Sequence, residues 1–209
     1  MDQPAIDEEE VEPRPLLIGP ASLLLGKAAG KEALPALLDL LRPAALLLTA
    51  IDPGSGDPED LANLRRLANN AAAALLIEDN LDLSADADGC HLNDSGAVKA
   101  ARERLGEDGL IGVEALSSRH DAMTAGDEGA DYVAFGRRDA ALTQDIVELV
   151  RWWRAMTVLP CLAYARDVEA VKTLRDAGAD FIGVSSLIFE HPEGAASAAR
   201  DLGEIFQNS

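Results

Sequence analysis

The sequence contains few aromatic residues and few cysteines. Phe, Trp and Tyr make up only 4% of its 209 residues, whereas hydrophobic residues make up 48%, so the core must be mainly aliphatic. An aliphatic core of this kind favours an α/β protein over a β-sandwich. The two cysteines, Cys90 and Cys161, are too few for a disulfide framework or a cysteine zinc centre. Each lies in a candidate strand, where we expect it to be a small buried residue.

Positive charge is also scarce. Lys and Arg number 18 against 37 Asp and Glu, which gives a formal net charge of −19. Because phosphate backbones and anionic lipids attract the opposite sign, we expect no nucleic-acid partner and no membrane-surface partner. No apolar run reaches the roughly 18 residues that a membrane span needs, and the N-terminus is acidic rather than basic and then apolar. These features predict a cytoplasmic protein.

Composition divides the chain into two parts. Residues 1–15, MDQPAIDEEEVEPRP, combine acidic residues with three prolines, which predicts a flexible acidic N-terminal segment. Residues 16–209 form the rest, which is long enough for one sizeable core and short for two. We therefore expect a single folded domain over 16–209.

Apolar runs of strand length alternate with helical patterns along this domain. The expected strands cover 16–19, 44–51, 72–78, 89–92, 109–113, 131–135, 158–163 and 180–184. The expected helices cover 27–41, 57–69, 81–85, 95–105, 117–128, 143–156, 167–177 and 192–206, with Asp57 and Ser117 as helix caps. Near-continuously apolar strands are typical of a parallel sheet covered on both faces. Eight strand–helix units predict an α/β fold of the (β/α)8 TIM barrel type.

A short motif occurs twice, as GADYVAF and GADFIGV, with a weaker copy near residue 88. Gly129 and Gly178 fall just after a helix, where glycine adopts a left-handed backbone at little cost. Asp88, Asp131 and Asp180 stand at the start of the following strands. These turns belong to the bottom of a barrel, where residues usually serve stability, so we interpret the repeat as architectural.

Charged residues of both signs are expected where the strands end. The carboxylates follow strands two to five: Asp52, Glu78, Asp79, Asp94 and Glu114. The arginines follow strands six and seven: Arg137, Arg138 and Arg166. Arg137, Arg138 and Arg166, with Ser185 and Ser186 after the eighth strand, could bind a phosphate group. The carboxylates could bind Mg²⁺, which prefers one or two acids together with water and substrate oxygens. A structural alternative stays open, in which the acids cap helices and the arginines pair with them across the rim.

Several common catalytic patterns are absent from the sequence. His91, His120 and His191 match no metal-ligand spacing, and we expect His91 to be a packed residue. There is no P-loop, no GxGxxG and no nucleophile elbow. The pattern therefore leaves the catalytic residues unknown.

The order of five segments resembles the thiamine-phosphate synthase and thiazole tautomerase superfamily. These segments are ADADGCHLNDS, GLIGVEALSS, GADYVAFG, LPCLAYARD and GADFIGVSSLIF. The resemblance implies a (β/α)8 barrel. Thiamine-phosphate synthases join a pyrimidine pyrophosphate to a thiazole phosphate and release pyrophosphate, with Mg²⁺. The resemblance assigns Asp79 to the metal, Asp94 to the metal in a shifted register, and Ser186 with Ser185 to the thiazole phosphate.

The chain departs from the pattern of this superfamily at several strand ends. Where the family has Gln-x-Arg-x-Lys after strand two, this chain has LLLTAIDPG, without a cation. Glu114 and Leu116 stand where the family has Ser and His after strand five. The loop after strand six is shortened to GRRDAAL, and Ala165–Arg166 replaces a Gly-Gly phosphate clamp.

These departures shape the expected function. We expect a divergent thiamine-phosphate-synthase-like barrel that binds a small phosphorylated or anionic molecule and whose synthase site is largely eroded. Close like-charge contacts between the acidic rim and a pyrophosphate would each cost about 1–4 kcal/mol. Two alternatives are an active Mg²⁺-dependent thiamine-phosphate synthase and a non-catalytic binding or interaction protein. The sequence leaves self-association into a homo-oligomer open.

Overall fold

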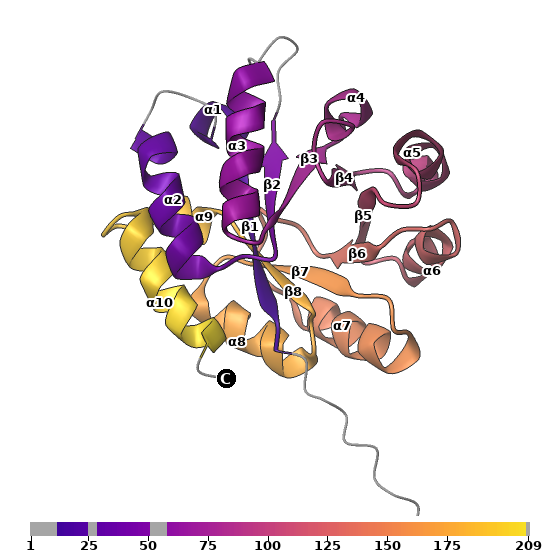
Figure 1. Cartoon of the computed structure of the whole chain (residues 1–209). Coiled ribbons are helices and arrows are strands. Elements are labelled where there is room, and N and C mark those ends of the chain that lie inside the picture. Colours follow the sequence, from indigo (N-terminus) through magenta and orange to yellow (C-terminus); the bar gives the residue numbers. More distant parts are fainter. Residues whose placement is uncertain (1–11, 25–28, 51–57, 208–209) are drawn as a thin grey trace, which may run out of the picture.

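The strands close into a barrel, as the sequence predicts. The computed structural model describes residues 12–24, 29–50 and 58–207. Strands β1 to β8 follow one another in sequence order around a closed, entirely parallel barrel, and β8 pairs with β1. Helices surround the strands as an outer ring (Figure 1). The chain is a single-domain (β/α)8 TIM barrel.

The elements lie close to their expected positions. The strands are β1 Arg14–Pro20, β2 Ala45–Thr49, β3 Ala74–Glu78, β4 Gly89–Leu92, β5 Leu110–Leu116, β6 Tyr132–Phe135, β7 Cys161–Ala165 and β8 Phe181–Val184. The longer helices are α2 Ala29–Leu41, α3 Pro58–Asn70, α5 Val98–Leu105, α6 Arg119–Asp127, α7 Gln144–Met156, α8 Val168–Ala177 and α10 Ala195–Gln207. The short ones are α1 Ala21–Leu24, α4 Leu81–Ser84, the 3₁₀ turn η1 Ser95–Ala97 and α9 Ser186–Phe189.

Several boundaries differ from the prediction. The first strand starts at Arg14, inside the segment that we expected to be flexible, because it pairs with β8 from its first residue. Ser118, not Ser117, caps α6, and its Oγ accepts a hydrogen bond of 3.1 Å from Asp121 N. The α7–β7 connection is longer than expected, and its Val158 is 99% exposed rather than part of a strand. The expected cap Asp57 lies outside the described residues.

The boundaries of two other elements also differ from the prediction. The fifth strand continues to Leu116, past the expected end at 113, with an irregularity in its pairing to β6 between Glu114 and Leu116. The final helix starts at Ala195 rather than 192, after the unexpected α9. The extension of β5 keeps Glu114 within the barrel wall and therefore fixes its direction more firmly than a loop would.

Apolar side chains form two separate cores. The larger core lies between the strands and the outer helices and includes both Cys90 and Cys161, which are buried and free as predicted. The smaller one fills the inside of the barrel with the side chains of Leu16, Ile18, Ala45, Leu47, Leu76, Tyr132, Ala134, Leu162 and Tyr164. Alternate residues of each strand belong to the two cores, because successive side chains in a strand point to opposite faces of the sheet.

The repeated aspartates tie neighbouring strands together at their amino ends. Asp88 Oδ2 accepts from Leu75 N at 2.8 Å, Asp131 Oδ2 from Ile111 N at 2.7 Å and Asp180 Oδ2 from Cys161 N at 2.8 Å. Each carboxylate also contacts an arginine of a helix two positions earlier in the chain order: Asp88 contacts Arg65 of α3, Asp131 contacts Arg102 of α5, and Asp180 contacts Arg154 of α7. This recurring contact explains the repeat, and its role is architectural, as predicted.

The glycines of the repeat take the expected backbone. Gly129 has φ +99° and Gly178 has φ +87°, so both occupy the left-handed region. Gly178 is the C-cap of α8, and its N–H donates to the carbonyls of Leu174 and Arg175. A side chain at either position would be strained, which accounts for glycine at these turns.

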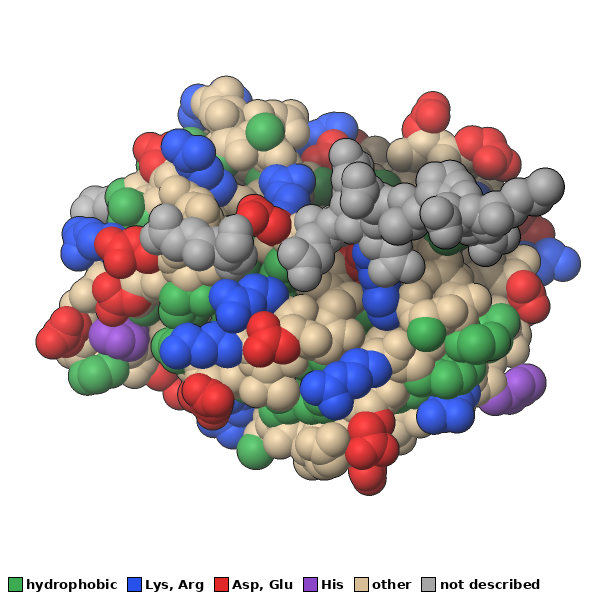
Figure 2. All heavy atoms as spheres, turned by 90° about the horizontal axis from the view of Figure 1, so that it is seen from below, with side chains coloured by type: hydrophobic (Ala, Val, Ile, Leu, Met, Phe, Trp, Pro, Cys, Tyr) green, Lys and Arg blue, Asp and Glu red, His purple; other side chains and the backbone are tan. Residues whose placement is uncertain are grey.

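The face of the molecule shown in Figure 2 has the mixture of charged and hydrophobic side chains expected of a water-exposed surface. Acidic and basic side chains are interspersed there, and hydrophobic side chains form small groups between them (Figure 2). The negative net charge is therefore not gathered into one patch on this face. Within the described ranges, no helix is both long and apolar enough to span a membrane.

Candidate functional site

A cavity of about 430 Å³ lies at the carboxyl ends of β4, β5 and β6. Its lining residues are Asn93, Glu114, Leu116, Gly136, Arg137, Arg138 and Asp139. They come from β5 and from the loops after β4 and β6. Active sites of TIM barrels lie at this face, because the loops that follow the strands meet there. We call this space the mouth cavity.

Arg138 crosses the mouth of the barrel. Its Nη2 donates to Glu78 Oε1 in a close ion pair and lies 3.7 Å from Glu114 Oε1. Its guanidinium carbon also lies 5.8 Å from the centre of the Tyr164 ring. The three charged side chains are mostly buried, with exposed fractions of 25% for Arg138, 15% for Glu78 and 8% for Glu114. One guanidinium therefore serves two carboxylates.

A hydrogen-bonded chain continues from Glu114 into the barrel. His91 is fully buried, with Nε2 3.2 Å from Glu114 Oε1 and Nδ1 2.8 Å from the Tyr132 hydroxyl. Because Glu114 Oε1 can only accept, Nε2–H donates to it and Nδ1 accepts from Tyr132; this tautomer is inferred from the network. The Tyr164 hydroxyl also donates to Glu114 Oε1. His91 is packed, as predicted, and it is also a polar link.

Burial changes the acidity of the two tyrosines. Removal from water raises the pKa of Tyr132 and Tyr164 well above the ordinary value of 10.0, and the negative charge of Glu114 raises both further. Both hydroxyls therefore stay protonated and keep donating at neutral pH. Burial lowers and Glu78 raises the pKa of Arg138, with a net rise, so the guanidinium stays charged.

Asp79 and Asp94 stand on the exposed rim after β3 and β4. Asp79 has a left-handed backbone, with φ +46°, and its N–H donates to the carbonyl of His91. Its Oδ1 accepts from Asn93 N at 2.9 Å, and its Oδ2 accepts from the Asn93 side-chain amide. Asp94 caps η1 by accepting from Gly96 N at 2.9 Å. The β3 and β4 ends are therefore joined through Asn93.

Comparison with known proteins identifies the family. The profile of the family described as thiamine monophosphate synthase matches residues 58–188, which include every residue that lines the mouth cavity. The thiamine-phosphate synthase of Hyphomonas neptunium is 40% identical over 156 residues, 70% of this chain and 71% of the relative. That of Rhodospirillum centenum is 37% identical over 154 residues, 69% and 74% of the two chains. The chain belongs to the thiamine-phosphate synthase family.

Solved structures support the fold of this family member. The thiamine phosphate pyrophosphorylase of Pyrococcus furiosus superimposes with a TM-score of 0.73 over 95% of this chain and 98% of the other, at 20% identity. A tryptophan synthase A-subunit from Pyrococcus furiosus gives 0.68 over 95% and 98%, at 14% identity. Likenesses at such low identity show the barrel fold alone.

In this thiamine-phosphate synthase family member, the predicted phosphate-binding residues are partly gathered. Arg137 and Arg138 line the mouth cavity, and Arg166 Nη1 donates to the carbonyl of Asp139 at 2.8 Å, beside it. Ser185 and Ser186 lie at the start of α9 and are not among the lining residues. Arg137 and Arg166 are exposed, whereas Arg138 is held by carboxylates. The structural alternative, pairing across the rim, thus applies to Arg138.

The predicted acids fall into different environments. Glu78 and Glu114 face the mouth, Asp79 and Asp94 lie on its rim, and Asp52 lies outside the described residues. No cluster of three or more His, Cys, Asp or Glu that could hold a metal ion occurs among the described residues.

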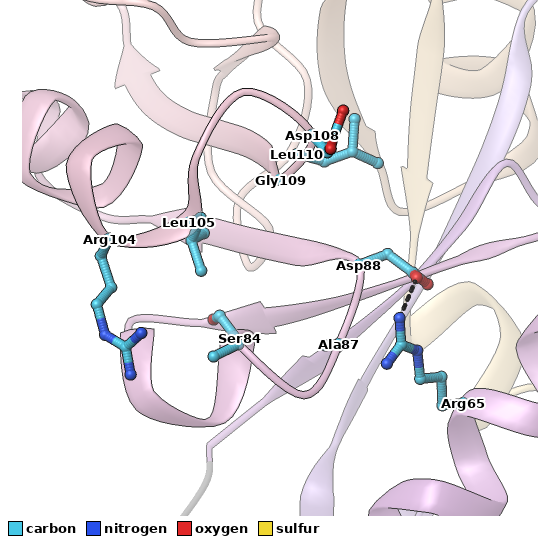
Figure 3. A pocket seen from close by; sticks show the side chains of 10 residues that line it. Arg65, Ser84, Ala87, Asp88, Arg104, Leu105, Asp108, Gly109 and Leu110 are labelled. Carbon is cyan, nitrogen blue, oxygen red and sulfur yellow. Dashed lines mark hydrogen bonds and ion pairs between the residues drawn. The ribbon is translucent and has the colours of Figure 1, made fainter.

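A larger cavity of about 600 Å³ opens at the amino ends of β4 and β5, and its lining side chains are shown in Figure 3. Its two arginines are both engaged: Arg65 with Asp88 at 3.1 Å, and Arg104 with Asp82 at 3.6 Å. Asp88 belongs to the architectural repeat. This cavity includes the Arg65–Asp88 pair of the architectural repeat and lies away from the carboxyl ends of the strands, so the mouth cavity is the candidate site.

Two members of the site were missed as polar groups by sequence analysis. Tyr132 lies inside the repeated motif GADYVAF, which we interpret as architectural, and Tyr164 directly follows the expected strand 158–163. The signal was present, because both occupy inward positions, where a buried hydroxyl needs a polar partner. Only the fold shows that His91 and Glu114 supply that partner.

Proposed function

We propose that this protein catalyses the thiamine-phosphate synthase reaction at the mouth cavity, joining a pyrimidine pyrophosphate to a thiazole phosphate and releasing pyrophosphate. The observation that carries the proposal is the family match over residues 58–188, which spans the whole lining of that cavity. The relatives named thiamine-phosphate synthase are 37–40% identical to this chain. The position at the carboxyl ends of the strands agrees with the chemistry of other TIM barrels.

Magnesium would bind at the rim. Mg²⁺ prefers one or two carboxylates and completes its shell with water and substrate phosphates, so a three-residue cluster is not required. Asp79 and Asp94 fit this demand, because both are exposed and a carboxylate has about four acceptor positions, of which each uses only part. When bound, the ion would neutralise charge on a leaving pyrophosphate. Asn93 would hold Asp79 in place for it.

Phosphate groups would meet the arginine side of the mouth. Arg137 and Arg166 are exposed there, and arginine matches a phosphate with two parallel hydrogen bonds. Ser185 and Ser186 would add hydroxyl and backbone donors at the start of α9. Arg138 would position rather than bind the phosphate, since its charge is already shared by Glu78 and Glu114.

A second candidate function is ligand binding without synthase turnover. The observation that favours it is the same ion pair: the described part of the mouth presents Glu78 and Glu114 beside its central arginine. A pyrophosphate approaching both carboxylates would be repelled unless a metal ion lies between them. In this case the barrel would bind a small phosphorylated molecule and leave it unchanged.

A turnover assay distinguishes the two candidates. Purified protein is mixed with the pyrimidine pyrophosphate, the thiazole phosphate and Mg²⁺, and thiamine phosphate is measured. We expect product with the wild-type protein, and Asp79→Asn is expected to reduce the rate by roughly tenfold or more. Asp201→Asn on the exposed side of α10 is the matched control and should leave the rate unchanged. No product from the wild-type protein would reject the synthase in favour of the binding function.

A binding measurement tests the phosphate side separately. Calorimetry with the thiazole phosphate alone should give heats of binding with the wild-type protein. Arg166→Ala should weaken the binding affinity by about tenfold or more, because a hydrogen bond to a charged group is lost. Arg200→Ala in α10 is a matched control for the removal of one arginine. Equal heats for wild type and Arg166→Ala would remove Arg166 from the site.

A further inference from the structure

The polar contacts that the Glu114 carboxylate makes with the described residues all fall on one of its two oxygens. Oε1 accepts from the Tyr164 hydroxyl and from His91 Nε2, and it is also the atom nearest to Arg138. Oε2 is buried and has no hydrogen-bond partner among the described residues. The side chain is only 8% exposed, and Glu114 lines the mouth cavity.

Such an atom is unusual in a folded protein. Most buried polar side-chain atoms have at least one hydrogen-bond partner, and leaving one unsatisfied destabilises the fold, more so when the group is charged. The three contacts on Oε1 hold the carboxylate in one orientation, so Oε2 cannot turn to share them. Because Glu114 lines the mouth cavity, its unpartnered oxygen belongs to a side chain that an occupant of that cavity would contact, and it has acceptor capacity to offer.

The charge around Oε2 limits what that occupant can be. Three acids, Glu78, Glu114 and Asp139, stand at the mouth against two arginines, Arg137 and Arg138, so one negative charge is in excess. A phosphate oxygen has no proton to donate in its fully ionised form, and it would be repelled by Glu114. An amino or ammonium group can donate, and the excess of negative charge attracts it.

We propose that Glu114 Oε2 accepts a hydrogen bond from an amino or ammonium N–H of the ligand, so that the mouth cavity selects small nitrogen-bearing molecules at this point. Phosphate groups of the same ligand would lie toward Arg137 and Arg166. This deepens the proposed function, because it names the group by which that same cavity chooses its ligand. The role belongs to Glu114 alone: His91, Tyr132 and Tyr164 position its carboxylate.

The test uses two small probes of nearly equal shape, 2-aminopyridine and 2-methylpyridine, at mildly alkaline pH, where both rings are mostly uncharged. Only the first has an N–H donor. Binding is followed by amide NMR shifts, and those of Asn93 and of Gly136 to Asp139 report on the mouth cavity. We expect wild-type protein to bind 2-aminopyridine about tenfold or more tightly than 2-methylpyridine, as one charge-assisted hydrogen bond allows.

Two variants locate the effect. Glu114→Gln keeps an acceptor toward His91 and Tyr164 but turns a donor toward the cavity, so it should lose the preference for the amine. Asp139→Asn removes a carboxylate from the same cavity lining and controls for diffuse negative charge; it should keep the preference. Thermal unfolding of each variant checks that it is folded. If Glu114→Gln does not fold, the comparison of the two probes on the wild-type protein still decides.

Three outcomes would overturn the proposal: equal binding of the two probes to the wild-type protein, failure of the wild-type protein to bind either one, or a preference that survives in folded Glu114→Gln. Binding needs no turnover, so its result is separate from that of the synthase assay. A protein that makes no thiamine phosphate but prefers the amine would keep this inference and lose the proposed function. A protein that makes thiamine phosphate but shows no preference for the amine would keep the proposed function and lose this inference.

Discussion

Arg138 is ion-paired with Glu78 across the mouth of the barrel, although 60 residues separate them in the sequence. Glu78 ends β3 and Arg138 follows β6, so the pair connects opposite parts of the ring. Glu114 lies close to the same guanidinium. This relationship joins the acidic and basic sides of the rim and determines which charges remain available to a ligand.

The first prediction concerns the removal of this shared cation. Arg138→Gln leaves Glu78 and Glu114 buried without their countercharge, and breaking such a pair is strongly destabilising. Because Arg138 is 25% exposed, water screens part of the effect, and we expect a loss of about 1–3 kcal/mol in the free energy of unfolding. Urea unfolding at neutral pH measures it. Arg137→Gln, on the exposed neighbour, should change stability by less than about 0.5 kcal/mol; equal losses would contradict the prediction.

The second prediction tests the architectural aspartates. Asp131→Ala removes the acceptor for Ile111 N and for Arg102, so a strand-end amide loses its partner. We expect a loss of about 1–2 kcal/mol in the free energy of unfolding, most of it from the amide, because the ion pair is partly exposed. Chemical denaturation checks the value, with Asp127→Ala in the last turn of α6 as the exposed control.

The same Asp131→Ala variant gives a second readout. Asp131 lies at the amino end of β6, opposite to the mouth cavity. Probe binding at the mouth by folded Asp131→Ala should therefore match that of the wild-type protein. A change in binding without a change in stability would give this aspartate a functional role and contradict the architectural one.

The third prediction concerns alkaline pH. Burial raises the pKa of the Cys90 thiol from 9.0 to about 11 and that of Cys161 to about 12. Above pH 9 the unfolded chain therefore releases these protons while the folded chain keeps them, so the unfolded state binds fewer protons and stability falls as pH rises. Unfolding midpoints measured between pH 8 and 11 should decline, and the decline should be shallower in Cys90→Ala. A flat profile would contradict this expectation.

The fourth prediction concerns the space beside Tyr132. A Cβ added at Gly112 would lie 2.0 Å from Tyr132 Cζ and 2.3 Å from its hydroxyl oxygen, so Gly112→Ala must displace the ring and its hydrogen bond to His91. Overpacking of this kind costs about 1–3 kcal/mol. Thermal unfolding measures the loss, and in a Tyr132→Leu background, where the clashing atoms are gone, the same substitution should cost less. Equal costs in both backgrounds would show that the ring is not the obstacle.

Local patterns in the sequence determined the barrel. Apolar runs of strand length that alternate with amphipathic stretches allow few other arrangements, and the glycine–alanine–aspartate turns mark where each strand begins. The boundaries of the strands do not follow from these local patterns, because a strand ends where its pairing with neighbouring strands stops. Leu116 belongs to β5 only because Phe135 of β6 lies opposite to it.

The chemistry of the mouth was visible in the sequence only as residue types at strand ends. The sequence placed Glu78, Glu114 and Arg138 at the correct end of the barrel and left open whether they bind a ligand or one another. Tertiary structure decided that Arg138 pairs with both acids and that the contacts of Glu114 converge on a single oxygen. The spacing of residues in the sequence specifies on which face of a strand, and at which end of the barrel, a side chain lies. Only the closure of the barrel brings together residues that are far apart along the chain.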